Sequence, residues 1–144
     1  MRQMASLEYF VVAESMSVDQ QTNQVSVFNI LEEVRTSNLP VVLPQVVCVC
    51  TLNLGANDMG MEHHAVLRVR TPSGEPREFA ARFKASHRRQ RVFTRLLGLP
   101  LETIGELVFE IMVDGRQLAT HTVFVELATP HSSPSSRPVA IGQA

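Results

Sequence analysis

The stretch at residues 105–127, GELVFEIMVDGRQLATHTVFVEL, is the feature that most narrows what this chain can fold into. Apolar residues alternate along its first half, and an Asp-Gly pair at positions 114–115 interrupts the pattern. Alternation with a period of two places every second side chain on one face of a β-sheet. Asp-Gly readily adopts the positive φ angles that a tight hairpin turn needs. The stretch therefore predicts a β-hairpin, and with it a β-rich fold.

The length of the hairpin turn decides which face of the second strand is buried. A two-residue turn at Asp114-Gly115 would direct one alternating set inward: Leu118, Thr120, Thr122 and Phe124. A three-residue turn with Gly115 in a bulge would direct the other set inward: Ala119, His121, Val123, Val125 and Leu127. The second set is more apolar, so we expect the bulge, with His121 turned toward the core.

Length and composition indicate one soluble domain. The chain has 144 residues, of which 44% are apolar and 19% charged, as in ordinary globular proteins. A formal net charge of −1 gives no overall attraction to nucleic acid or to anionic membranes. The apolar patch at residues 7–13 contains one glutamate and precedes another, unlike a signal peptide, and no apolar run is long enough to span a bilayer. We expect a cytoplasmic protein without membrane association.

Further short strands are expected along the rest of the chain. They are predicted at residues 7–14, 25–34, 46–54, 61–71, 78–84 and 92–99. The 25–34 stretch could also form a helix, but its β-branched residues favour a strand. Residues 35–44 are expected to be irregular, because Pro40 and Pro44 oppose a central strand. About seven or eight strands in all predict an all-β, two-sheet antiparallel β-sandwich over residues 1–128, followed by a flexible Ser/Pro-rich tail at 129–144.

Three stretches of the chain carry a resemblance to a known family: LEYFVVAESMSVDQQTNQVSVFNILEEV (7–34), HHAVLRV (63–69) and GLPLETIGELVFEIMVDG (98–115). They resemble an uncharacterised bacterial family of small immunoglobulin-like β-sandwich proteins, over about residues 4–127. The corner at residues 104–107 lacks the tyrosine that many immunoglobulin-like domains carry there. The resemblance implies an immunoglobulin-like fold and no known activity.

A basic segment is the strongest functional signal in the sequence. Six of the thirteen Lys and Arg residues lie between Arg82 and Arg95, and no Asp or Glu occurs from 79 to 101. Clustered arginines bind carboxylates and phosphates. We expect a basic loop at residues 84–95 that recognises an acidic protein partner through Lys84, His87, Arg88, Arg89, Arg91 and Arg95. The alternatives are nucleic-acid binding, with Phe83 and Phe93 stacking on bases, and a solvated connection without a binding role.

The N-terminal strand offers a second candidate surface. In the predicted strand, Phe10 and Val12 lie on the face opposite Tyr9 and Val11. If Phe10 and Val12 are exposed, they would form a patch for self-association.

Cysteine and histidine residues suggest the remaining alternative, a metal- or thiol-dependent enzyme. Cys48 and Cys50 share one face of a predicted strand, where they pair poorly, so we expect two buried thiols. His63 and His121 could meet in the sandwich interior near Cys48 or Cys50. The sequence contains no nucleophile-elbow motif, phosphate-binding Gly-rich loop or zinc-type Cys/His spacing. We therefore expect a non-catalytic binding or assembly module with no cofactor and no metal.

Overall fold

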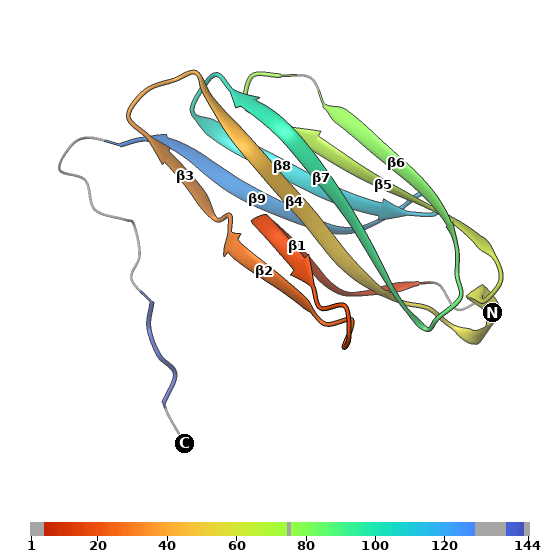
Figure 1. The fold of residues 1–144 in the computed structure, drawn as a ribbon. Coiled ribbons are helices and arrows are strands. Elements are labelled where there is room, and N and C mark those ends of the chain that lie inside the picture. Colours follow the sequence, from red (N-terminus) through yellow and green to blue (C-terminus); the bar gives the residue numbers. More distant parts are fainter. Residues whose placement is uncertain (1–4, 75, 129–137, 143–144) are drawn as a thin grey trace.

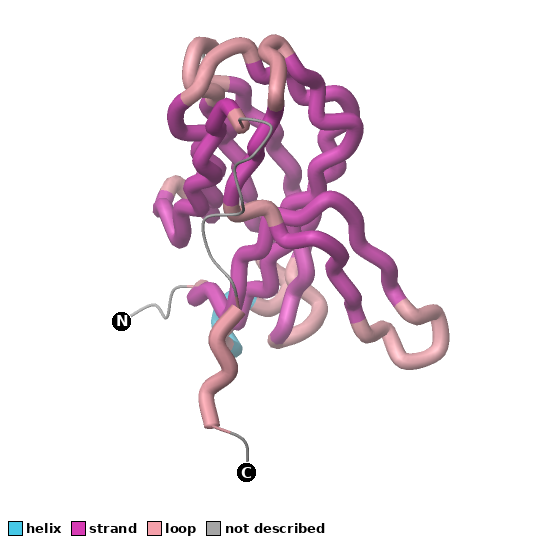
Figure 2. The backbone as a smooth tube through the Cα atoms, turned by 90° about the vertical axis from the view of Figure 1, so that its left-hand side faces the viewer, coloured by secondary structure: helices cyan, strands magenta, loops and turns pink. Residues whose placement is uncertain are grey.

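The computed structural model describes residues 5–74, 76–128 and 138–142 and shows an all-β protein with two sheets (Figure 1). The strands are β1 (Ser6–Val18), β2 (Val25–Ile30), β3 (Glu33–Thr36), β4 (Val41–Asn53), β5 (Glu62–Arg70), β6 (Arg77–Lys84), β7 (Arg89–Leu101), β8 (Gly105–Val113) and β9 (Arg116–Leu127). A 3-10 turn, η1 (Ala56–Asp58), lies beside the start of β1 at one end of the sheets (Figures 1 and 2). None of the helical segments described is long and apolar enough to cross a membrane.

The two sheets have the strand orders β2-β1-β4-β7 and β3-β9-β8-β5-β6. They pack face to face, because one buried cluster contains residues of both sheets, such as Val46 of β4 and Phe109 of β8. The prediction of seven or eight strands is wrong by at least one, because the 25–34 stretch divides between two sheets. Strand β2, of the four-stranded sheet, ends at Ile30, and strand β3, of the five-stranded sheet, begins at Glu33. The antiparallel prediction also fails at one place, where β3 pairs with β9 in parallel.

The predicted hairpin is present as β8 and β9, but its turn differs from the expected one. Val113 pairs with Arg116 across a two-residue turn, in which both Asp114 (φ 51°) and Gly115 (φ 80°) have positive φ. The register then shifts beyond Ile111, where β9 has one extra residue. That later bulge restores the expected inward set, of which Val123 and Val125 are buried while Leu127 is exposed.

The prediction of an irregular segment before residue 46 is wrong. Strand β4 begins at Val41 and includes Pro44. This part of β4 pairs with β7 alone, since the pairing of β4 with β1 extends only from Val47 to Asn53. Pro44 therefore lies where β4 behaves as an edge strand, and an edge tolerates the missing N–H of proline.

The β1–β2 hairpin covers part of the outer face of the four-stranded sheet. Val47 and Val49 point away from the core between the sheets, yet both are fully buried by a cluster that includes Met16, Val25 and Val27. The hairpin turn reaches beyond β4, because Asn23 accepts hydrogen bonds from Arg91 of β7. This hairpin gives the four-stranded sheet a second, smaller apolar layer.

The expected self-association patch on β1 does not exist as such. Val12 is 0% exposed and belongs to the core between the sheets, against which Phe10 also packs. The outer positions of β1 are occupied instead by Tyr9 and Val11. Most of the predicted tail, residues 129–137 and 143–144, lies outside the described residues.

Candidate functional site

The predicted basic loop is mostly a strand. Only residues 85–88 connect β6 to β7, so Lys84 ends β6 and Arg89, Arg91 and Arg95 belong to β7. His87 and Arg88 are the two predicted residues that lie in the connection. The predicted strand at residues 92–99 is confirmed as part of β7, but the basic charges before it favoured a loop in our interpretation.

Strand β7 presents three arginines and two apolar side chains on the outer face of the four-stranded sheet. The register pairs Arg91 with Thr51 and Phe93 with Val49, which sets the odd-numbered side chains outward. Phe93 is 50% exposed and Leu97 is 77% exposed. The Arg95 guanidinium carbon lies 5.7 Å from the centroid of the Phe93 ring, within the range of a cation–π contact. We call these side chains the β7 stripe: Arg89, Arg91, Phe93, Arg95 and Leu97.

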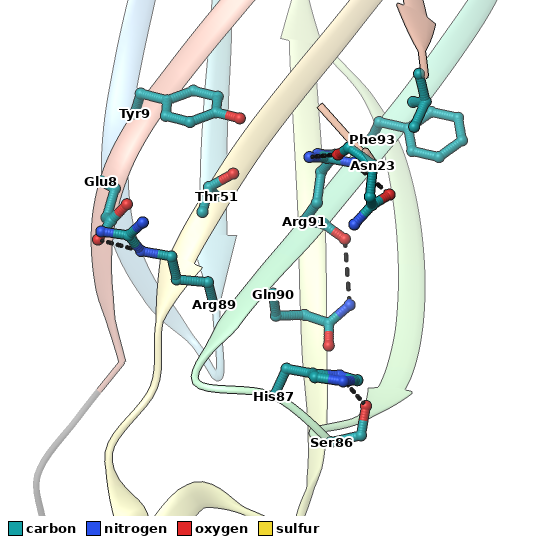
Figure 3. A pocket seen from close by; sticks show the side chains of 11 residues that line it. Glu8, Tyr9, Asn23, Thr51, Ser86, His87, Arg89, Gln90, Arg91 and Phe93 are labelled. Atoms are coloured by element: carbon teal, nitrogen blue, oxygen red, sulfur yellow. Dashed lines mark hydrogen bonds and ion pairs between the residues drawn. The ribbon is translucent and has the colours of Figure 1, made fainter. Parts of the chain in front are cut away.

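One end of the β7 stripe borders a hollow of about 770 Å³ (Figure 3). This outer hollow is lined by residues of β1, β4, β7, the β1–β2 turn and the β6–β7 connection: Glu8, Tyr9, Val18, Asn23, Thr51, Ser86, His87, Arg89, Gln90, Arg91 and Phe93. Its volume is within the range of small-molecule sites. The hollow brings together three of the six predicted residues, His87, Arg89 and Arg91, whereas Lys84, Arg88 and Arg95 lie outside its lining.

Both arginines of the outer hollow are held by protein groups. Arg89 Nε lies 3.1 Å from Glu8 Oε1 in an ion pair. Arg91 donates from Nη2 to the Asn23 carbonyl oxygen (2.9 Å) and from Nη1 to Asn23 Oδ1 (3.4 Å). These contacts hold the two guanidinium groups in place in the lining of the hollow, which lowers the entropic cost of binding an anion there.

A second polar cluster surrounds His63 at the end of β5. His63 is 2% exposed, its Nδ1 lies 2.7 Å from Asp114 Oδ2, and its Nε2 lies 3.2 Å from the Asp58 carbonyl oxygen. The His63 ring also stacks on Phe83, with 5.5 Å between centroids. Burial on its own lowers the pKa of His63. The hydrogen bonds to Asp114 and Asp58 and the charges of both carboxylates raise this pKa by more than burial lowers it, so the net shift is upward. The cluster joins β5, the β8–β9 turn and η1.

The predicted meeting of His63 and His121 in the interior is wrong. His121 pairs with Phe109, which pairs on its other side with Val69, six positions along β5 from His63. Six residues of strand separate the two histidines by roughly 20 Å. His121 Nε2 instead lies 2.6 Å from the Leu31 carbonyl oxygen.

The cysteines are buried thiols, as expected. Burial raises the pKa of Cys48 to about 12, with a smaller contribution from Cys50, and burial raises the pKa of Cys50 to about 11. Both side chains therefore remain protonated near neutral pH, and a thiol is a far weaker nucleophile than a thiolate. In the part of the chain that the structure describes, no three His, Cys, Asp or Glu residues form a group that could hold a metal ion.

Sequence reasoning missed several residues of the outer hollow, chiefly Tyr9, Asn23 and Thr51. They come from three separate segments that only the folded sheet and its hairpin bring together. Thr51 left one signal, because it continues the alternation of Val47 and Val49 with a hydroxyl in place of a methyl group. A polar residue at a buried strand position is a reasonable sign of a site.

The fold and the outer hollow define a two-sheet β protein with an arginine-bearing edge strand beside a solvent-accessible hollow. Residues 8–126 match a family of unknown function, DUF6941. The chain belongs to this family, which confirms the resemblance to a family without known activity. A search of curated proteins found no match.

Proposed function

We propose that this chain is a non-catalytic binding module whose strand β7 receives an acidic segment of another protein. The observation that carries the proposal is the β7 stripe on an edge strand. Strand β7 is the last in the order β2-β1-β4-β7, so the side away from β4 has no strand neighbour in the described structure. Such an edge offers N–H and C=O groups to an added strand, and the side chains beside it provide the specificity.

The distribution of charge supports an acidic partner. Lys84, Arg88 and Arg95 form no ion pair with any residue that the structure describes. On the outer face of the five-stranded sheet, three arginines are neutralised by glutamates in the pairs Arg68–Glu78, Arg70–Glu110 and Arg82–Glu62. Arg88 and Arg95 thus lie at or beside the β7 edge without an ion pair among the described residues, whereas Lys84 lies opposite Glu62 on the five-stranded sheet.

The spacing of the β7 stripe specifies the sequence of the partner strand. Side chains that lie opposite each other in neighbouring strands share a face, and each favourable pair contributes about 0.2–1 kcal/mol. A partner strand would place acidic residues opposite Arg91 and Arg95, and apolar residues opposite Phe93 and Leu97. Its pattern would therefore be acid-x-apolar-x-acid-x-apolar.

Two observations favour this role over the alternatives. Phe83, one of the two rings considered for stacking on bases, is half-buried and stacks on His63, which leaves Phe93 as the exposed ring of the pair. Protonated thiols and a His63 with both ring nitrogens in hydrogen bonds support a non-catalytic protein. The immunoglobulin-like arrangement, bacterial origin and cytoplasmic location stay predictions.

The double substitution Arg95→Glu/Leu97→Ser should weaken binding of a peptide with the repeat Glu-Thr-Val-Thr by about tenfold or more. It removes one charge pair and one apolar pair and adds a repulsion, which together approach the 1.4 kcal/mol of a tenfold change. Both side chains are exposed, so we expect the folded state to keep its stability. Fluorescence anisotropy of the labelled peptide measures the affinity.

The matched control is Arg82→Glu/Leu127→Ser, with the same change in charge and one exposed leucine on the five-stranded sheet. This control should bind the peptide as the unaltered protein does. Equal loss in both double variants, or absence of binding to the unaltered protein, would contradict the proposal. Steeply salt-dependent binding of a single-stranded oligonucleotide in place of the peptide would favour the nucleic-acid alternative.

A further inference from the structure

Three polar side chains form a row across the floor of the outer hollow. Tyr9 of β1 pairs with Thr51 of β4, and Thr51 pairs with Arg91 of β7. Residues paired in this way lie on one face, with neighbouring strands about 4.8 Å apart. Figure 3 shows the Tyr9 ring extending from β1 toward Thr51, with Arg91 on the far side of Thr51. The row therefore places two hydroxyl groups and a guanidinium within reach of one small ligand.

The polar groups of this row have unused hydrogen-bonding capacity. Arg91 Nε is buried and has no hydrogen-bond partner among the residues that the structure describes. No residue of the described chain forms a hydrogen bond with the hydroxyl group of Tyr9 or of Thr51. An unsatisfied buried donor costs about 1–3 kcal/mol, and more when it is charged. The Thr51 hydroxyl has no partner in the described chain but is not among the buried unpaired atoms, so it is accessible to a ligand in the hollow.

Charge and shape restrict what could occupy the hollow. Its lining carries the guanidinium groups of Arg89 and Arg91 but only one carboxylate, Glu8, which is already paired with Arg89. The next row along the sheet is apolar and ends at the half-exposed ring of Phe93, which also lines the hollow. The lining thus combines net positive charge and hydroxyl donors with aromatic walls at Tyr9 and Phe93.

We propose that the outer hollow binds a small organic anion, one that joins a carboxylate or phosphate to a flat apolar ring. The anion accepts hydrogen bonds from Arg91, Tyr9 and Thr51, and the ring packs between Tyr9 and Phe93. This site shares Arg91 and Phe93 with the proposed docking of a protein strand. Tyr9 and Thr51 belong to the anion site alone, and Arg95 and Leu97 belong to the strand surface alone, so variants at these positions distinguish the two proposals.

Binding should also move the β1–β2 turn. Arg91 Nε is closed off from solvent while Asn23 holds the other two nitrogens of the guanidinium. A carboxylate or phosphate brings a full negative charge to arginine and can bind its guanidinium through two parallel hydrogen bonds, whereas the Asn23 oxygens are neutral. An anion that reaches Arg91 Nε therefore competes with Asn23, and amide hydrogen exchange at residues 19–24 should become faster.

Titration of the ¹⁵N-labelled protein with adenosine 5′-monophosphate and with benzoate tests the proposal. We expect saturable shifts at residues 9, 23, 51 and 91 with at least one of the two, and their relative affinity decides between phosphate and carboxylate. Adenosine, benzamide and inorganic phosphate should each bind at least about tenfold more weakly, because each lacks either the charge or the ring. Thr51→Val and Tyr9→Phe should each weaken binding about tenfold, as expected for a lost hydrogen bond to a charged group.

The isosteric variants separate a ligand role from a structural one. Because neither hydroxyl has a partner in the described chain, Thr51→Val and Tyr9→Phe should leave Tm unchanged or raised, and Thr122→Val on the other sheet should leave affinity unchanged. The proposal is overturned if neither anion gives saturable shifts at millimolar concentration, or if adenosine or phosphate alone binds as tightly as the nucleotide. Unchanged affinity in both hydroxyl variants would overturn it as well.

Discussion

Val12→Asp should prevent this protein from folding, with a loss of more than about 4 kcal/mol in the free energy of unfolding. Val12 is 0% exposed and packs in the core between the sheets, with Val46 and Val123 in the same cluster. A carboxylate at this position loses its hydration and finds no cation in that apolar cluster. We expect insoluble protein, or soluble protein without the circular dichroism and cooperative thermal transition of the unaltered chain.

Val42→Asp is the matched control, because Val42 undergoes the same chemical change at a position that is 55% exposed on β4. It should alter stability by no more than about 0.5–1 kcal/mol. A folded Val12→Asp variant with an unaltered Tm would show that Val12 is on the surface and would refute the inward orientation of β1.

Strand β1 shows when the alternation of apolar residues cannot predict which face of a strand is buried in the core. Both faces of this strand are apolar at residues 9–12, because one packs in the sandwich core and the other under the β1–β2 hairpin. With apolar residues on both sides, the period of two does not say which side is inner. Strand β8 gave a correct prediction because its inner residues are apolar and its outer ones include Glu110, which pairs with Arg68 and Arg70.

Only part of the candidate site could be predicted from the sequence, because only some of its residues are neighbours along the chain. The arginines of β7 were found because their cluster is local in sequence. Tyr9 and Thr51 join Arg91 only through two strand registers, and Asn23 joins it only because the hairpin bends across β4. No local pattern encodes a bend of this sort, since it depends on the packing of Met16 and its neighbours against Val47 and Val49.

The β1–β2 hairpin also explains why the two proposed binding surfaces lie where they do. It buries Val47 and Val49 and leaves the β7 side of the same face open, so that Phe93 and Leu97 remain exposed. The outer face of the five-stranded sheet also carries apolar side chains, such as Val66 and Met112, but ion pairs among Arg68, Glu78 and Glu110 lie next to them. On this face, the β1–β2 hairpin buries one apolar area and leaves the apolar and basic side chains of β7 exposed. An exposed apolar area of this kind is typical of a surface that binds a partner.

Asp114→Ala should lower the free energy of unfolding by about 3 kcal/mol. Asp114 Oδ2 lies 2.7 Å from His63 Nδ1, and Asp114 Oδ1 accepts from the His64 backbone N–H at 2.9 Å. Alanine leaves the buried His63 ring without this partner, at a cost of about 1–3 kcal/mol. Alanine also tolerates the positive φ of 51° at position 114 poorly, which adds about 1 kcal/mol. Urea unfolding monitored by circular dichroism measures the loss.

Asp114→Asn separates the charge from the turn geometry, because asparagine accepts a positive φ and keeps an oxygen acceptor. The raised pKa of His63 in the folded protein means that its stabilising contribution is fully present below the unfolded pKa of about 6.5 and is lost as pH rises through the folded pKa. The unaltered protein should therefore exceed Asp114→Asn in stability by more at about pH 6 than at about pH 8. A difference that is constant or grows with pH would show that His63 gains no charge-dependent stabilisation from Asp114, and the cluster would then act through hydrogen bonding and packing alone.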